Sequence, residues 1–550
     1  MGMYLNPGKQ RFQIAINSEI YVDKTGMIRY LNTVLNTNQR YVSVSRPRRF
    51  GKTMAADMLC AYYDRTADSR DMFEHTNLVN NTDSAQGKWD EYLNQYNVIR
   101  IVMTDFIKSD RDVTDSIKLL SKRVLDELHE SYPMVEYDAD DFPFSFEKFY
   151  IHAERQFVII IDEWDAIFRI RMDDKSGQKQ YLDFLRDWLK DKEFIALAYM
   201  TGILPIKKYG EHSALNMFDE YSMTQPMQLA EYTGFTNEEV KELCEKYNMD
   251  FDEIESWYDG YQVSDNVPVS KRQLYREGKY EEHVISLYSP LSVVNAVTSG
   301  MIKNYWNKTE SYEALAEYIR RDYDGLKESV ALLMNGGRIR INTSSYQNDM
   351  TTFNGKDDIL SLLIHLGYLG FDDKTSEVFI PNKEVMDVFT VSTQNKEWVS
   401  TFKTFEKSVD LLKATWNMDE EKVSTTLEEI HDLTSNKTYN DEAALSYSIQ
   451  LAYYAAQKYY TEILELDSGK GYADIVYIPA PEFNDKPVLL VELKYNKNVE
   501  TALSQIKNRN YVGRLEHYKG NILLVAIDYD NEALSTNEDF KHHSCRIERA

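Results

Sequence analysis

The chain of 550 residues is too long for one hydrophobic core, so two to four domains are expected. Its formal net charge of −26 excludes a protein that coats nucleic acid through bulk basicity, although a local basic groove remains compatible with it. The 3 widely spaced cysteines argue against a disulfide framework and a cysteine zinc cluster, and they fit a cytoplasmic protein. No apolar run approaches the roughly 18–20 residues that span a bilayer, so no membrane partner is expected.

The N-terminal 60 residues predict a short strand, a second strand, a tight loop and a helix. Residues 20–25 read as the first strand, with Tyr21 as an alternative neighbour of an adenine base. Residues 41–44 read as a buried strand, and residues 54–59 read as the first turns of a helix. Between them stands Ser-Arg-Pro-Arg-Arg-Phe-Gly-Lys-Thr at 45–53. Strand, loop ending in Gly-Lys-Thr, and helix is the context that a phosphate-binding loop requires.

If the ligand is ATP, the motif predicts a role for each residue of this loop. We expect Lys52 to reach the β- and γ-phosphates and the Thr53 hydroxyl to bind Mg²⁺. Backbone N–H groups at the helix start would face phosphate oxygens, which the helix dipole favours. Arg46 stands where the usual pattern has glycine, and a solvated basic loop is the alternative for each loop arginine. The other cofactor-binding candidates are Arg46, Arg48, Arg49, Phe50, Gly51 and Met54.

A second motif supports nucleotide binding. Residues 157–161 form a continuous apolar run, which is typical of a parallel strand covered on both faces. Asp162 follows and would bind Mg²⁺, and Glu163 would polarise the attacking water. The alternative is a core strand that merely ends in two exposed acids.

Two further strands complete the predicted sheet. Residues 98–103 and 195–200 are apolar runs, and a helical pattern separates the first of them from the Asp162 strand. Thr201 ends the later strand and is a candidate sensor of the γ-phosphate, with a plain turn residue as the alternative. Strands alternating with helices predict a parallel, doubly wound α/β sheet whose ligands lie at the carboxyl ends of the strands.

The middle of the chain predicts a lid and a connector. Residues 231–345 read as mostly helical, with turns at 257–261 and 288–290. A helix over 357–369 followed by an edge strand over 378–382 suggests a winged-helix-like element. The predicted domains are an ATPase core at 1–230, a helical and winged-helix-like lid at 231–395, a charged helical connector at 396–440 and a final domain at 441–550.

The final domain predicts a metal-dependent hydrolytic site. A turn and strand over 469–479 and a second strand over 487–495 bring Asp474 beside Glu492, and Lys494 shares the face of Glu492. Two acids and a lysine on one sheet surface are costly unless a cation such as Mg²⁺ lies between them. Asp474 and Glu492 would hold Mg²⁺ and Lys494 would act on the water in phosphodiester hydrolysis. Glu442 could add a carboxylate and Gln505 could position substrate. A half-exposed hairpin with a Glu492–Lys494 salt bridge is the alternative.

Several of the motifs described above resemble those of the bacterial AAA-ATPase-like family. Members of this family commonly carry a C-terminal domain of the PD-(D/E)XK nuclease superfamily. The strings that carry the ATPase resemblance lie at 46–53, 21–25, 161–165, 201–203 and 257–261, and those of the nuclease at 472–474 and 491–494. The resemblance implies an ASCE-type P-loop ATPase with Glu163 as base, and a restriction-endonuclease-like fold from about residue 440. The family also departs from the glycine pattern at the position of Arg46.

The sequence therefore predicts an ATP-binding protein, with ATP hydrolysis, coupled to a Mg²⁺-dependent nuclease. Analogy with the nuclease superfamily favours DNA as the substrate and leaves RNA open. The alternative is an ATP-dependent switch or scaffold whose nuclease-like domain only binds a partner. A basic groove would favour the nuclease, and its candidate residues are Lys497, Lys507, Arg509 and Arg514. A homo-oligomer is compatible with the sequence.

Overall fold

A computed structural model gives the fold of the chain. The described residues are 2–80, 88–206, 215–264, 284–306, 312–320, 325–394, 396–433, 442–467, 472–508, 521–530 and 541–550. Packing divides the chain into two compact units, the first formed by 1–314 with 340–388 and the second by 315–339 with 389–550. Within the described ranges, no helix has both the length and the apolar character needed to cross a membrane.

A five-stranded parallel sheet forms the centre of the first unit. Its strand order is β2-β3-β4-β1-β5, so β4 lies between β1 and β3. Every residue of β1, β3 and β4 is buried, as covering both faces of a parallel sheet requires. The strands are β1 (Tyr41–Ser45), β2 (Asn97–Val102), β3 (Phe157–Asp162), β4 (Ile195–Gly202) and β5 (Asp219–Tyr221).

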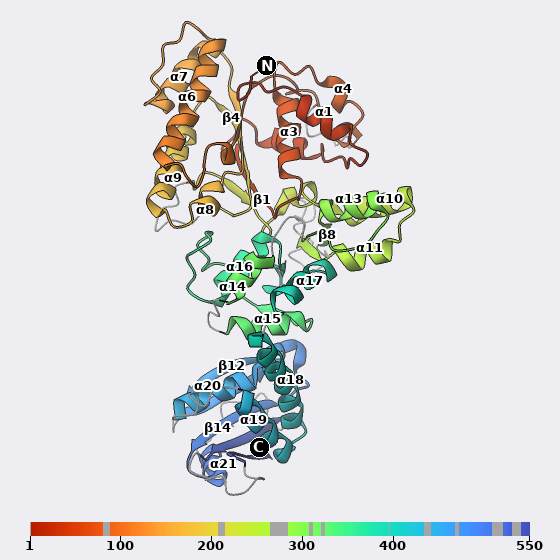
Figure 1. The fold of residues 1–550 in the computed structure, drawn as a ribbon, viewed down its shortest axis with the longest axis vertical. Coiled ribbons are helices and arrows are strands. Elements are labelled where there is room, and N and C mark those ends of the chain that lie inside the picture. Colours follow the sequence, from red (N-terminus) through yellow and green to blue (C-terminus); the bar gives the residue numbers. More distant parts are fainter. Residues whose placement is uncertain are drawn as a thin grey trace. The chain divides into compact units, whose positions relative to one another are not determined.

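Helices cover both faces of this sheet. Figure 1 shows α1 and α3 on one side of β4 and α6, α7 and α9 on the other. The helices of this region are α1 (Gln10–Ile16), α2 (Met27–Val34), α3 (Lys52–Tyr63), α4 (Arg70–Phe73), α5 (Asn77–Asn80), α6 (Val113–Ser131), α7 (Phe142–Ala153), α8 (Ala166–Ile170) and α9 (Lys175–Leu189). The doubly wound α/β architecture predicted from the sequence is therefore confirmed.

The region after the parallel sheet contains more strand than the sequence predicted. The strands β6 (Phe235–Thr236), β8 (Val284–Tyr288) and β7 (Tyr261–Ser264) form an antiparallel sheet in that order. Burial alternates along β7, because Tyr261 and Val263 enter the core while Gln262 is exposed. The sequence predicted a mostly helical region with turns, and these three short strands are an addition to it. The helices that accompany this sheet are α10 (Asn237–Tyr247), α11 (Phe251–Tyr258) and α13 (Pro290–Ser299).

The predicted helix and edge strand near residue 370 form a small helix–hairpin element. The helix α16 (Lys356–Leu366) ends at Gly367, whose φ of +87° is the left-handed conformation that favours glycine. An antiparallel pair follows, β10 (Gly370–Asp372) with β11 (Glu377–Phe379). The remaining elements here are α14 (Tyr312–Arg320), α15 (Leu326–Met334), β9 (Ile339–Arg340) and α17 (Lys383–Ser392).

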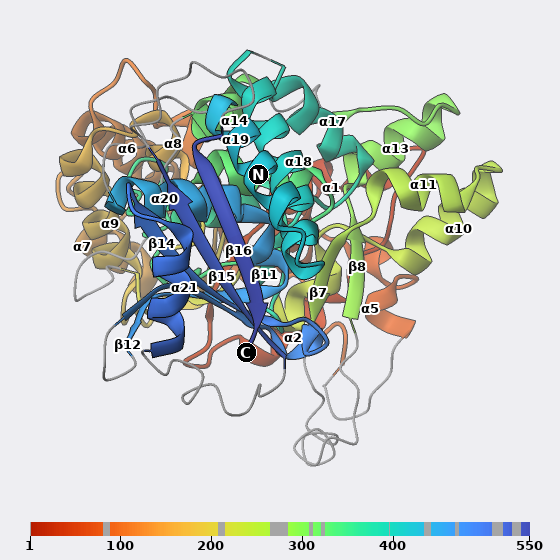
Figure 2. The same cartoon turned by 90° about the horizontal axis from the view of Figure 1, so that it is seen from below.

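The second unit is built on a mixed five-stranded sheet in the order β12-β13-β14-β15-β16. Only the β14–β15 pair is parallel, and Figure 2 shows β14, β15 and β16 side by side. The strands are β12 (Tyr460–Asp467), β13 (Tyr472–Pro479), β14 (Val488–Tyr495), β15 (Ile522–Tyr529) and β16 (His543–Arg549).

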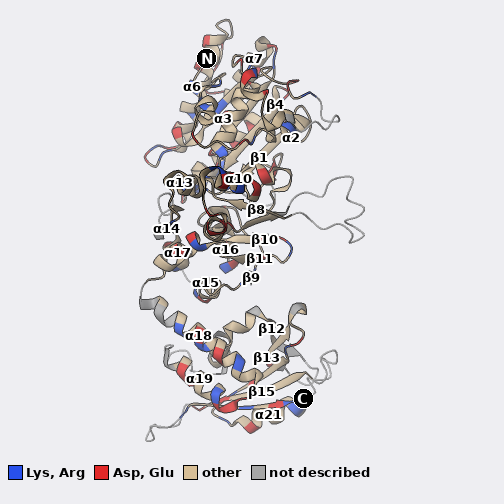
Figure 3. Cartoon of the chain, turned by 90° about the vertical axis from the view of Figure 1, so that its right-hand side faces the viewer, with Lys and Arg blue, Asp and Glu red and all other residues tan. Residues whose placement is uncertain are grey.

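Helices also cover both faces of the mixed sheet. One face packs α18 (Lys396–Trp416), α19 (Glu420–Leu433) and α20 (Glu442–Ala452), and the other packs α21 (Val499–Asn508). Two of these helices, α18 and α19, fall in the range predicted as a connector, yet their apolar side chains belong to the core of this unit. Figure 3 shows acidic and basic residues mixed along α18, α19 and α21, whereas the strands are mostly uncharged.

Candidate functional site

The phosphate loop joins β1 to α3 through two residues with positive φ. Gly51, which precedes α3, has φ +85°, and Arg49 has φ +64°. Glycine adopts the left-handed region without steric cost, so the chain turns sharply at Gly51 and aims the first N–H groups of α3 out of the loop. The predicted strand, loop and helix are all present, with the helix starting at Lys52.

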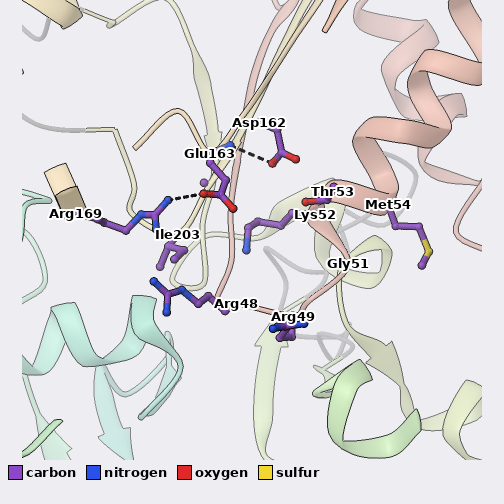
Figure 4. Close-up of a pocket in the computed structure, with 11 residues that line it drawn as sticks. Arg48, Arg49, Gly51, Lys52, Thr53, Met54, Asp162, Glu163, Arg169 and Ile203 are labelled. Carbon is purple, nitrogen blue, oxygen red and sulfur yellow. Dashed lines mark hydrogen bonds and ion pairs between the residues drawn. The ribbon is translucent and has the colours of Figure 1, made fainter. Parts of the chain in front are cut away.

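The loop borders a cavity of about 560 Å³ at the carboxyl ends of β3 and β4. The lining residues are Arg48, Arg49, Gly51, Lys52, Thr53, Met54, Asp162, Glu163, Arg169, Gly202 and Ile203. Figure 4 shows that the Lys52 side chain extends toward the same space as Glu163. Most of the residues predicted to hold nucleotide therefore share one cavity.

Lys52 is buried and its ammonium is held by the loop itself. Its Nζ donates to the carbonyl oxygens of Arg46 at 3.0 Å and Pro47 at 2.7 Å. Burial lowers the pKa of Lys52 to about 8, and the nearby Asp165 and Asp162 oppose that shift. The ammonium thus lies in a place where an anion would stabilise its charge.

Asp162 lies at the end of β3 among oxygen and nitrogen groups. The Thr53 hydroxyl hydrogen-bonds its carboxylate, and Arg100 lies 3.6 Å from Oδ2 while it pairs with Asp57 at 2.9 Å. Burial raises the pKa of Asp162, although Arg100, Thr53 and Lys52 oppose the shift. A hydroxyl beside a carboxylate is an oxygen donor set that fits Mg²⁺.

Glu163 is held by an ion pair that the sequence did not predict. The Arg169 guanidinium lies 3.0 Å from Glu163 Oε2 and 3.2 Å from Asp165 Oδ2, as Figure 4 shows for the first contact. Asp165 is buried and also accepts the backbone N–H groups of Ile203 and Leu204, both at 3.0 Å. The sequence signal for the Asp165–Arg169 contact was the i, i+4 spacing of these two residues.

Thr201 lies in the sheet beside the acid strand. The parallel register pairs it with Asp162 on one side and with Val44 on the other. Its side chain is buried, and Oγ1 has no hydrogen-bond partner within the described part of the chain. Thr201 does not line the cavity, although its neighbours Gly202 and Ile203 do.

The side chains of Arg46 and Phe50 do not line the phosphate cavity. Arg46 is fully buried and donates through one nitrogen to the carbonyl oxygens of Ser45 at 2.9 Å and Tyr221 at 2.8 Å, which links β1 to β5. The structure therefore does not bring the Arg46 side chain to a phosphate, because it is used inside the core. Phe50 packs edge-on against Tyr261 at 5.4 Å between ring centroids.

A second cavity of about 320 Å³ adjoins the first and shares Arg49, Gly51 and Met54 with it. Its other lining residues are mostly apolar: Phe12, Ser18, Ile20, Tyr21, Val22, Lys24, Phe50, Ala55, Met58, Tyr232, Gly234, Phe235, Pro290, Leu291 and Val294. The segment 20–24 forms no strand, which contradicts the predicted N-terminal strand. Its residues Tyr21 and Val22 face this cavity instead.

The C-terminal candidates converge at one end of the mixed sheet. Continuing the β13–β14 register places Asp474 opposite Glu492, and Asp474 Oδ2 accepts the backbone N–H of Leu493 at 2.6 Å. Lys494 Nζ lies 3.3 Å from Glu492 Oε1 and donates to the Leu493 carbonyl oxygen at 2.7 Å. Gln505, from α21, donates to the same Oε1 of Glu492.

Two members of this group are buried, whereas Asp474 and Gln505 are partly exposed. Glu492 is 0% exposed and Lys494 is 5% exposed. An acid and an amine withdrawn from water need close partners, because desolvation alone would disfavour both charges. The Glu492–Lys494 ion pair of the half-exposed hairpin that the sequence left as an alternative is present, but both of its partners are buried.

Comparison with protein families identifies both regions. The family described as "Predicted AAA-ATPase" matches residues 8–210, and the PD-(D/E)XK nuclease superfamily matches residues 440–539. The chain combines an AAA-ATPase-like domain with a PD-(D/E)XK nuclease superfamily domain. The resemblance stated from the sequence motifs is confirmed.

Individual relatives are distant from this chain. An "Uncharacterized protein in vnfD 5'region" of Azotobacter chroococcum mcd 1 is 23% identical over 288 residues, which cover 50% of this chain and 52% of the relative. The chain thus spans about half the length of this curated relative.

Solved structures also resemble the chain at low scores. The Aeropyrum pernix ORC1 protein in complex with DNA has 12% identity and a TM-score of 0.24, over 73% of this chain and 99% of that chain. Cdc6p from Pyrobaculum aerophilum has 12% identity and a TM-score of 0.25, over 67% of this chain and 92% of that chain. The Aeropyrum pernix ORC2 protein has 9% identity and a TM-score of 0.25, over 70% of this chain and 98% of that chain. Scores this low carry no argument about function.

The nuclease superfamily domain holds one more acid that the sequence analysis missed. Asp528 of β15 pairs in register with Lys494, is 5% exposed, and accepts the backbone N–H of Lys497 at 3.2 Å. Burial raises its pKa, which the Lys497 hydrogen bond opposes. Its signal was a lone acid at the end of the apolar run 522–527.

Several predicted nuclease residues cannot be placed in this site. Glu442 begins α20, but its side chain lies outside the described part of the structure, as do Arg509 and Arg514 entirely. Lys507 pairs with Glu548 at 2.7 Å. The basic groove predicted from the sequence therefore stays a prediction.

Proposed function

We propose that the AAA-ATPase-like domain binds ATP with Mg²⁺ and hydrolyses it. The observation that carries this proposal is the meeting of Lys52, Thr53 and Asp162 in one cavity at the ends of parallel strands. A buried ammonium and the N–H groups of a helix start suit a triphosphate. The hydroxyl of Thr53 and the carboxylate of Asp162 would hold Mg²⁺, which supplies charge neutralisation between the phosphates when bound.

We assign phosphate binding, proton transfer and phosphate sensing to further residues in and beside the cavity. Lys52 would leave the carbonyl oxygens of Arg46 and Pro47 and pair with the β- and γ-phosphates. Glu163 would accept a proton from the attacking water once its pairing with Arg169 loosens. Thr201, which pairs in register with Asp162 and precedes Gly202 of the cavity wall, is the proposed sensor of the γ-phosphate.

The adjoining apolar cavity fits the base of the nucleotide. It touches the phosphate cavity through Arg49, Gly51 and Met54, so one ligand could extend across both. Tyr21, Phe235 and Val294 offer the mostly apolar walls that a planar base requires.

We further propose that the C-terminal domain cleaves phosphodiester bonds with Mg²⁺. The supporting observation is that Asp474 and Gln505 converge on the buried Glu492 and Lys494. The two carboxylates would hold Mg²⁺, which supplies Lewis-acid polarisation of the phosphate when bound. Lys494 would orient the attacking water and stabilise the charge that develops on the phosphate, and Gln505 would keep Glu492 in place.

DNA is the proposed substrate by analogy with the nuclease superfamily. The chain's buried free cysteines agree with a reducing cytoplasm, where we place the reaction. The test incubates the full chain with double-stranded DNA, single-stranded DNA and RNA, in Mg²⁺ or in a chelator, with and without ATP. We expect cleavage of DNA that Mg²⁺ supports and the chelator abolishes. Binding of DNA without cleavage in any condition would instead favour the non-catalytic scaffold.

A further inference from the structure

Four side chains meet where α19 approaches the start of β16, and none of them belongs to the sites described above. Glu428 and His431 are three residues apart on α19, so they project from one side of that helix. His542 and His543 lie at the start of β16, where His543 pairs in register with Tyr529. Neither proposed hydrolytic reaction uses this cluster.

Glu428 bridges two of the histidines, and a third histidine lies close to this group. Glu428 Oε1 lies 2.6 Å from His542 Nδ1, and Oε2 lies 2.9 Å from His543 Nδ1. One donor atom each of Glu428, His431 and His543 falls within 4.8 Å of the other two. Ligands of a tetrahedral ion with bonds of about 2.0–2.2 Å stand roughly 3.3–3.6 Å apart, so small side-chain movements would bring all three into range.

The cluster is enclosed and its rings are oriented by packing. His431 is 6% exposed and His543 is 2% exposed. Tyr529 stacks on His542 at 5.6 Å between centroids and meets His431 edge-on at 5.4 Å. Rings fixed in this way would lose little freedom on binding an ion, which favours a built site over a chance gathering.

The donor set selects the kind of ion. Two imidazole nitrogens and one carboxylate oxygen are typical ligands of zinc and similar transition metals, whereas Mg²⁺ and Ca²⁺ prefer oxygen alone.

We propose that Glu428, His431 and His543 form a structural site for a divalent transition metal of the zinc class, with His542 beside it as a further ligand or hydrogen-bond partner. The site would fasten α19 to the C-terminal strand. Glu428 and His543 are 115 positions apart, so an ion between them closes a long loop and adds its binding free energy to that of folding.

Metal analysis of the full chain tests this site. The chain is purified without a histidine tag, stripped with a chelator, supplied with zinc and then desalted. We expect about one bound zinc per chain and a higher melting temperature with zinc, because a ligand that binds only the folded state stabilises it. His431→Ala and His543→Ala should lose both effects, while the exposed His75→Ala should keep them.

Two further measurements keep the result clear. Glu492→Gln should retain the zinc, which separates this site from the proposed nuclease site. Cobalt added to the stripped wild-type chain should give the visible absorption bands of a tetrahedral ion, a readout that needs no variant to fold. A stripped wild-type chain that takes up no zinc, shows no cobalt bands and gains no thermal stability would overturn the proposal. So would equal zinc uptake by His431→Ala.

Discussion

The Lys52 ammonium makes the ATP site sensitive to pH. Burial lowers its pKa to about 8, and only the protonated form attracts phosphate. The charged fraction falls as pH rises through that value, so ATP affinity of the wild-type chain should fall with it. Titration with a fluorescent ATP analogue across this range measures the effect. Lys52→Arg, which stays charged, should show no such decline, and a parallel decline in both proteins would contradict the assignment.

Arg46 and Arg48 form a matched pair of loop arginines with different positions. Arg46 donates to two buried carbonyl groups, whereas Arg48 lines the phosphate cavity. Arg46→Met should lower the free energy of unfolding by about 1–3 kcal/mol and leave ATP affinity within about twofold. Arg48→Met should weaken ATP binding and leave stability unchanged. Denaturant unfolding and nucleotide titration of both variants check the pair, and the reverse pattern would restore Arg46 to the phosphate site.

Glu163 is the proposed base for ATP hydrolysis. Glu163→Gln removes the proton acceptor but keeps the shape of the side chain, so it should lower the hydrolysis rate by about 10²–10⁴-fold while ATP still binds. Phosphate release measures the rate, and Glu193→Gln, at an exposed acid, serves as control. Undiminished hydrolysis would require a different base.

At this scale the sequence predicted residues whose roles follow from local spacing. Lys52, Thr53 and Asp162 were found because a strand, a turn and a helix start are contiguous in the chain. Arg46 was assigned to phosphate because a motif specifies residue types and not side-chain directions. Arg169 was missed because its partner Glu163 reaches it only through the turn between β3 and α8.

Phe50 connects the phosphate loop to the elements that follow the parallel sheet. Its ring is fully buried against Tyr261 of β7, and its carbonyl oxygen accepts the N–H of Gly234 at 3.1 Å. Phe50→Ala should therefore lower the unfolding free energy by about 3–5 kcal/mol. Phe144→Ala, at a ring that is 54% exposed, should cost less than about 0.5 kcal/mol. Equal effects in thermal unfolding would contradict the packing described.

Strands with long apolar runs were predicted well, and short strands were not. β3 and β4 are buried on both faces, so their composition alone marks them. β6 has two residues, and β7 and β8 are separated by many positions, so their pairing depends on contacts far apart in sequence. Asp528 escaped notice for the same reason, since only the parallel pairing of β14 with β15 brings it to Lys494.

The two candidate sites lie in two separately packed units of the chain. The first unit holds the cavity with Lys52 and Asp162, and the second holds the group with Asp474 and Glu492. Each site lies at an end of a sheet, where strand ends bring side chains from distant parts of the sequence together. A substitution in one site should therefore leave the folding of the other unit intact.

Cleavage by Glu492→Gln tests the central claim most directly. This substitution removes one carboxylate charge from the buried group, so Mg²⁺-dependent DNA cleavage should fall at least about 100-fold. Thermal unfolding of the second unit should match wild type, which shows that the variant is folded where it is changed, and the exposed Glu500→Gln on α21 should cleave normally. Cleavage by Glu492→Gln at the wild-type rate would contradict the assignment of a hydrolytic site to the C-terminal domain.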